Sequence, residues 1–185
     1  MIPKLKMGSG MTYLATSGVC RLTGLSTDKL REWTSRRSLI PADVPSRQQG
    51  SPARYGWATV LVLRLAVVMR DQFHVELQAN SSLFAGLRKE LSKRPFLSLR
   101  GYSLALQGAG TWALVEDGDV PPGDALLIRL DPHLAAISAG FPQRDLAHAG
   151  QQRDLFPLAG LASTGLKAFV EPQAGKPAVD RRRSA

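Results

Sequence analysis

The segment Val19–Trp33, with the sequence VCRLTGLSTDKLREW, constrains the fold more than any other part of the chain. The apolar residues of its first part fall on one face of a short helix over residues 17–23. Gly24 follows directly, and because glycine adopts a left-handed backbone without steric cost, it suits the turn that ends such a helix. The sequence therefore predicts a short helix followed by a sharp change of direction.

A second helix is predicted to begin after this turn and to run to about Arg37. Ser26 or Thr27 can cap it, because a short hydroxyl side chain at this position accepts a hydrogen bond from a free backbone N–H. Leu30 and Trp33 are three residues apart and share its buried face. The remaining positions are rich in cations, namely Lys29, Arg31, Arg36 and Arg37. Two short helices at a steep angle are typical either of a helical hairpin in a core or of a helix–turn–helix whose second helix fits into a partner.

The rest of the chain is predicted to contain two longer helices, a few strands and a last short helix. Residues 42–56 are rich in proline, glycine and serine, which predicts a loop or a short hairpin. Pro95 ends the second long helix, because the residue before a proline disfavours helical backbone. The elements after residue 56 are expected to be helices over 57–73 and 81–93, strands over 97–107, 111–118 and 125–131, and a helix over 132–139 capped by Asp131.

The excess of positive charge is confined to the first half of the chain. The net charge is +9; residues 1–94 contain 15 Lys and Arg against 6 Asp and Glu, whereas residues 95–185 contain nine of each. A basic half beside a neutral half indicates that the first half meets a polyanion and that the second has another role.

Several classes of protein are excluded or disfavoured. A single cysteine, Cys20, rules out a disulfide within the chain and a metal site built from several thiolates. The most apolar segment, residues 57–69, is too short to span a bilayer and carries Arg64 in its middle, and the first residues do not resemble a secretory signal, so we expect a cytoplasmic protein without membrane contact. No nucleophile–base arrangement and no phosphate-binding glycine loop is evident, so we expect neither an enzyme nor a bound metal or cofactor.

The order of elements in the first half is that of a winged helix-turn-helix. The first helix and the apolar face of the second would form a small core that projects the second helix into a major groove, and residues 42–56 would be the wing. The predicted fold class is a mainly α N-terminal winged helix-turn-helix followed by a small α+β C-terminal region. Its expected regions are a flexible leader over 1–11, the DNA-binding domain over 12–94, a small α+β domain of unknown role over 95–170 and a disordered tail over 171–185.

The first half also resembles the DNA-binding domain of the MerR family of bacterial regulators. The resemblance covers roughly residues 11–92 and depends on a few short motifs. They are RLTGLS at 21–26, Leu30-Arg31 with Trp33, the exit Leu39-Ile40-Pro41, and the pair Arg54-Tyr55 at the end of the wing. The chain departs from the family pattern in three places: an extra residue between Trp33 and Leu39, Ser38 where a glycine is common, and Pro95 where a long dimerisation helix usually continues.

The resemblance implies a sequence-specific transcriptional regulator that binds double-stranded DNA as a homodimer. Arg31 is the expected base or phosphate contact, Arg54 and Tyr55 would hold the backbone, and Trp33 would either touch a phosphate or fill the core. Arg36 and Arg37 are either phosphate contacts or solvated surface. The full set of candidate DNA-binding residues is Thr27, Asp28, Lys29, Arg31, Trp33, Arg36, Arg37, Arg47, Arg54 and Tyr55.

Two other classes stay open at this point. One is an excisionase-like or architectural DNA-binding factor of a mobile element, which also uses small winged domains. The other is a protein-interaction module, because the apolar run over 60–69 could pack against another chain. No residue of the region 95–170 indicates an effector.

Overall fold

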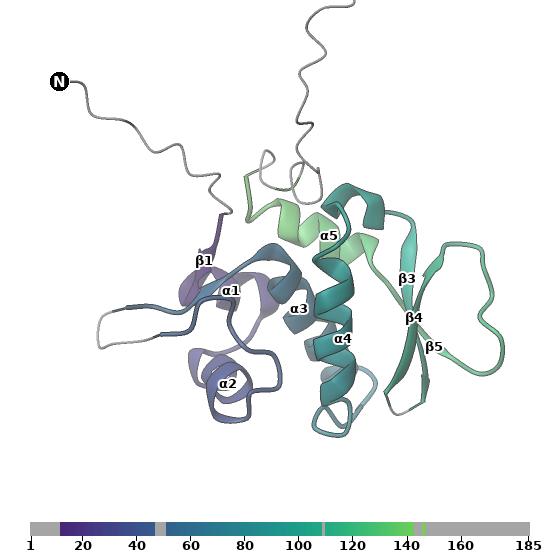
Figure 1. Cartoon of the computed structure of the whole chain (residues 1–185), viewed down its shortest axis with the longest axis horizontal. Helices are drawn as coiled ribbons and strands as arrows, with labels where there is room; N and C mark the ends of the chain where they lie inside the picture. Colours follow the sequence, from purple (N-terminus) through teal and green to yellow (C-terminus); the bar gives the residue numbers. More distant parts are fainter. Residues whose placement is uncertain (1–11, 47–50, 109, 143–145, 147–185) are drawn as a thin grey trace, which may run out of the picture. The chain divides into compact units, whose positions relative to one another are not determined.

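A computed structural model describes residues 12–46, 51–108, 110–142 and 146. The chain divides into two compact units, residues 1–152 and 153–185, and all of the described residues lie in the first. They form a mixed α+β fold with five α-helices and two small antiparallel sheets (Figure 1). The predicted leader over 1–11 and the predicted tail over 171–185 lie outside the described residues.

The first two helices form as the sequence predicts. Helix α1 (Thr16–Thr23) ends at Gly24, whose φ of 77° is left-handed and whose N–H donates to the Cys20 carbonyl at 2.9 Å. Helix α2 (Thr27–Arg31) is capped by Ser26, whose hydroxyl accepts from the N–H of Lys29 at 3.2 Å. Of the two capping residues that the sequence allowed, Ser26 is therefore the one used.

The loop over 42–56 is anchored by a strand that the sequence did not indicate. Strand β1 (Leu14–Ala15) pairs with β2 (Arg54–Tyr55) in an antiparallel sheet, so that Leu14 lies opposite Tyr55. A further bridge joins Val44 to Arg54 and closes the base of the loop into the predicted short hairpin. The C-terminal end of this loop is thus paired with the residues just before α1, and Val44 on its other side is bridged to that end.

Helices α3 and α4 supply most of the core. Helix α3 (Trp57–Asp71) buries side chains on nearly all of its surface, and Val60, Leu61 and Leu65 are fully buried. Helix α4 (Ser81–Leu91) ends four residues before Pro95, which is extended with a ψ of 140°, and a 3₁₀ turn, η2 (Phe96–Leu99), follows. No helix within the described part of the chain is long and apolar enough to cross a membrane.

A three-stranded antiparallel sheet follows, with the strand order β4-β3-β5. It consists of β3 (Tyr102–Gly108), β4 (Thr111–Glu116) and β5 (Leu126–Arg129), close to the predicted strands. Leu104 lies at its centre, opposite Leu114 on one side and Ile128 on the other. Because both outer strands are antiparallel to β3, residues 117–125 must cross from one end of the sheet to the other.

The last described helix, α5 (Asp131–Ser138), forms where expected, but its predicted cap is wrong. Leu130 occupies the N-cap position, and Asp131 is the first helical residue. The Asp131 carboxylate accepts instead from the backbone N–H of Gly101 at 3.1 Å, which joins the start of α5 to the turn before β3. A long-range donor competes here with the local capping bond that the sequence suggests.

One hydrophobic core extends across the predicted boundary between residues 94 and 95. The cluster includes residues from Val19 to Leu146, and α3 and α4 lie between the α1–α2 pair and the three-stranded sheet (Figure 1). Gly86 of α4 faces the ring of Trp112, where an added Cβ would be only 3.2 Å from the ring. The Asn80 side chain donates to the Glu76 carbonyl and accepts from the N–H of Gly110. The boundary is therefore a change of secondary structure within one core.

Candidate nucleic-acid interface

The cation-rich helix predicted over residues 27–37 forms in two parts. Helix α2 continues directly into a π-helical turn, η1 (Glu32–Arg36), in which the N–H of Arg37 donates to the Glu32 carbonyl at 2.8 Å. We refer to Thr27–Arg36 as the α2–η1 helix. Leu30 and Trp33 lie on its buried side, as their spacing predicts. Its exposed side carries Thr27, Asp28, Arg31, Ser35 and Arg36.

The α2–η1 helix ends in a tight turn at Ser38. Ser38 has a φ of 50°, in the left-handed region where the resemblance places a glycine. The N–H groups of Leu39 and Ile40 both donate to the Trp33 carbonyl, at 2.9 and 3.3 Å. These bonds satisfy the Trp33 carbonyl in the last turn of the helix, and the chain then turns back toward the core.

Two of the candidate cations are already bound to a carboxylate. Glu32 pairs with Lys29 at 2.9 Å through one oxygen and with Arg37 at 2.8 Å through the other. The hydrogen bond from Lys29 is the main cause that lowers the pKa of Glu32, and the charge of Arg37 adds to it. We call this group of three residues the Glu32 clasp.

Arg31 and Arg36 differ from these two cations. Both side chains are exposed, and neither has an ion-pair partner among the residues that the structure describes. An exposed guanidinium without a carboxylate partner is available for a phosphate or for the edge of a base. These two residues are therefore the cations that the helix presents most freely.

The loop over 42–56 is held in place by α4. Asp43 accepts from the N–H of Gly56 at 2.7 Å with one oxygen, and its other oxygen pairs with Arg88 at 3.1 Å. Arg88 also donates to the Pro41 carbonyl at 2.6 Å. This network fixes the base of the loop to α4, and the Arg54 side chain is exposed. The candidate Arg47 lies outside the described residues.

The structure places two candidate contact residues in the core. Trp33 and Tyr55 are each only 2% exposed, so neither has a surface to present to a duplex. The Tyr55 hydroxyl lies 3.5 Å from that of Thr34, which itself donates to the Leu30 carbonyl. The predicted contact of Tyr55 with a nucleic-acid backbone is therefore not supported, and of the two interpretations of Trp33 the core position is the observed one. Pairing with β1 turns the Tyr55 ring inward, which the local sequence does not show.

A small cavity of about 190 Å³ lies behind the α2–η1 helix and was not predicted. Arg70 of α3 is placed over the Trp33 ring at 4.9 Å and pairs with the carboxylate of Asp71. Both apolar and charged side chains line the cavity, and its lining residues are Lys29, Trp33, Arg37, Leu39, Arg70, Val75, Glu76, Leu77 and Gln78. The cations Lys29, Arg37 and Arg70 are paired with Glu32 or Asp71, neither of which lines the cavity, so their charge is largely neutralised.

Within the described ranges, no three His, Cys, Asp or Glu side chains come close enough to hold a metal ion. Comparison of the chain with protein-family models, with curated proteins and with solved structures gives no match.

Proposed function

We propose that the chain is a sequence-specific DNA-binding transcriptional regulator of MerR-like type. In this proposal residues 12–94 act as a winged helix-turn-helix, with the α2–η1 helix as recognition helix and the loop over 42–56 as wing. The observation that carries the proposal is Arg31, which is exposed and has no ion-pair partner among the described residues, on a helix that begins at the Ser26 cap shortly after the Gly24 turn. Two of the motifs behind the MerR resemblance, RLTGLS and Leu30-Arg31 with Trp33, lie in this turn and helix.

The proposed mechanism separates positioning from base reading. Arg31 would form two parallel hydrogen bonds with a guanine edge, a contact that contributes about 1–3 kcal/mol of discrimination against other bases. Thr27 and Asp28, at the exposed N-terminal end of the same helix, would approach neighbouring bases. Arg36 and the loop residue Arg54 would contact phosphates, which add affinity without sequence preference.

The partner in this proposal is double-stranded DNA, bound by a homodimer on inverted half-sites in the cytoplasm. We propose no catalytic activity, no cofactor and no membrane partner. Light scattering of the purified chain tests the dimer directly, because a mass of one chain at DNA-binding concentrations contradicts it.

The first prediction tests the function itself. Selection from random duplexes with the full chain should yield a motif, and Arg31→Ala should remove the preference for that motif, whereas Arg54→Ala should weaken binding to all duplexes alike. Arg100→Ala is the matched control, because Arg100 is an exposed arginine in the region after α4, away from the proposed surface. Affinities are measured at two salt concentrations, since phosphate contacts weaken with salt.

The outcomes of this selection distinguish the candidate functions. A motif that depends on Arg31 supports the regulator, and its symmetry reports whether two chains read it. If no motif emerges and affinity only falls with salt, the regulator is excluded and the excisionase-like or architectural alternative takes its place. If the chain binds no duplex at all, the protein-interaction alternative is favoured.

A further inference from the structure

The hydrogen-bond pattern of the α2–η1 helix changes just where the helix carries most of its charge. The N–H of Glu32 bonds back four residues to the Asp28 carbonyl, as in an α-helix, whereas the N–H of Arg37 bonds back five residues to the Glu32 carbonyl. A π-turn contains one residue more than an α-turn, and such turns are rare and often found at functional sites. Here the π-turn accommodates the extra residue between Trp33 and Leu39.

The π-turn decides where Arg37 lies. In an uninterrupted α-helix Arg37 would follow Leu30 by seven residues and Trp33 by four, and so would share their buried face. Instead the turn rotates its side chain outward, where it is 55% exposed and 2.8 Å from a Glu32 oxygen. Residues five apart in an α-helix point about 140° away from each other, so this ion pair depends on the π-turn.

We propose that Glu32 is a positioning residue of the DNA-binding surface. It holds Lys29 and Arg37 in the Glu32 clasp, and so leaves Arg31 and Arg36 as the cations of the α2–η1 helix that meet DNA. This inference rests on the function proposed above. Because affinity for any duplex grows with the number of phosphates neutralised, withholding two cations weakens non-specific binding more than it weakens base reading by Arg31. The Glu32 clasp thereby increases the ratio of specific to non-specific affinity.

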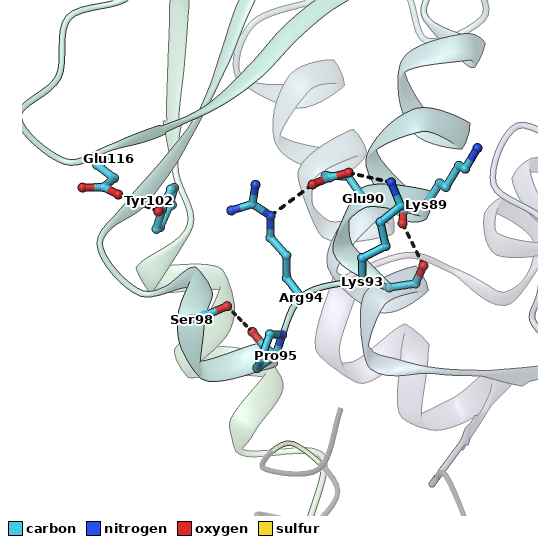
Figure 2. Close-up of polar contacts among 9 residues, drawn as sticks. Lys89, Glu90, Lys93, Arg94, Pro95, Ser98, Tyr102 and Glu116 are labelled. Carbon is cyan, nitrogen blue, oxygen red and sulfur yellow. Dashed lines mark hydrogen bonds and ion pairs between the residues drawn. The ribbon is translucent and has the colours of Figure 1, made fainter. Parts of the chain in front are cut away.

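The chain contains a matched control for this clasp. Glu90 of α4 also binds two cations, Lys93 at 3.2 Å and Arg94 at 3.2 Å, as Figure 2 shows. Glu32→Gln and Glu90→Gln therefore make the same change of charge and each release two cations. Only the first change falls on the α2–η1 helix.

The second prediction compares these two variants of the full chain. Binding to the selected site and to a random duplex is measured over a range of salt concentrations, and thermal melts check that both variants fold. Glu32→Gln should strengthen binding to the random duplex severalfold and steepen the slope of log K against log[salt] by about 0.9 for each released cation that reaches a phosphate. Binding to the selected site should strengthen less, so specificity falls. Glu90→Gln should leave the slope and the specificity unchanged.

Arg37→Gln completes the test as a double-mutant cycle. In the otherwise unchanged chain it should leave the salt slope as it is, because Arg37 is held by Glu32. In the Glu32→Gln background it should reduce the slope by about 0.9. If Arg37→Gln alone already reduces the slope by that amount, Arg37 contacts DNA in the intact protein and the inference is overturned.

The two proposals fail in different ways. If Glu32→Gln and Glu90→Gln behave alike while the unchanged chain prefers its selected site, the inference about Glu32 is wrong and the DNA-binding function stands. If the unchanged chain shows no preference for any site, the proposed function fails, and the inference about specificity fails with it.

Discussion

At the scale of single residues, Ser38 adopts a left-handed backbone conformation that is unfavourable for any residue other than glycine. Its φ of 50° is left-handed, a conformation that costs a non-glycine residue roughly 1–2 kcal/mol. The Ser38 hydroxyl compensates in part by donating to the Ser35 carbonyl at 3.3 Å. The position is strained because the turn must bring Leu39 and Ile40 back to the core directly after the helix.

The third prediction is that Ser38→Gly stabilises the protein. Glycine removes the backbone strain but loses the hydroxyl bond and gains freedom in the unfolded chain, so we expect a gain of about 0.5–1 kcal/mol in the free energy of unfolding. Ser35→Gly is the control, since Ser35 is exposed within the helix and should lose about 0.5–1 kcal/mol. Urea unfolding measures both, and a loss of stability in Ser38→Gly would show that the hydroxyl bond outweighs the strain.

At the scale of elements, α4 positions the loop over 42–56 through one side chain. Arg88 binds both the Asp43 carboxylate and the Pro41 carbonyl, and Asp43 in turn holds the N–H of Gly56. In the described part of the loop, a single backbone bridge, Val44–Arg54, joins its two sides, so this network and the pairing with β1 determine where its base lies. The proposed wing therefore depends on Arg88, which lies 45 residues after Asp43 in the chain.

The fourth prediction is that Arg88→Met loosens this loop without unfolding the core. Methionine keeps the apolar stem but leaves Asp43 unpaired, so the amides of Val44, Arg54 and Gly56 should exchange with solvent about threefold to tenfold faster. Arg94→Met is the matched control, because Arg94 is another half-exposed arginine, shortly after α4, whose side-chain partners in the described structure are Glu90 and the Tyr102 ring and not the loop. Hydrogen exchange that is equal in both variants would mean that β1 alone holds the loop.

At the scale of the whole molecule, two partly buried basic groups join three helices that are distant in the sequence. Arg64 of α3 donates to the Leu22 carbonyl in the last turn of α1, and His133 of α5 lies close enough to Arg64 to feel its charge. The Nδ1 atom of His133 is buried without a hydrogen-bond partner in the described structure. Burial, and then the charge of Arg64, lower the pKa of His133.

The fifth prediction follows from this lowered pKa. The unfolded chain binds a proton at His133 near pH 6.5 and the folded chain only at a lower pH, so the free energy of unfolding should be constant above about pH 7 and should fall as the pH drops through 6.5. His133→Phe should remove this part of the pH dependence. His74→Asn is the control, because His74 is an exposed histidine whose φ of 53° asparagine tolerates. Urea midpoints between pH 5 and 8 that decline equally in both variants would contradict the assignment.

The sequence by itself determined the local features of this protein. The Gly24 turn, the Ser26 cap, the buried pair Leu30 and Trp33, and the end of α4 before Pro95 all depend on bonds and steric limits within a few residues. Such features can be read from spacing and residue type, because the atoms concerned are neighbours in any conformation of the chain. The hairpin and the third strand were predictable for the same reason, since alternating apolar residues indicate a sheet with one buried face.

Only the tertiary structure decided which candidate residues are free to act. Strand β1 pairs with residues about 40 positions away and turns Tyr55 inward. The π-turn brings Arg37 to Glu32. The Asp131 carboxylate accepts a hydrogen bond from Gly101 instead of capping α5. In each case a local preference competes with another partner. That partner is either distant in the sequence or, for Arg37, a residue that only the π-turn brings within reach. The spacing of residue types does not predict which of these side chains are exposed and unpaired, because packing and charge in the folded chain determine it.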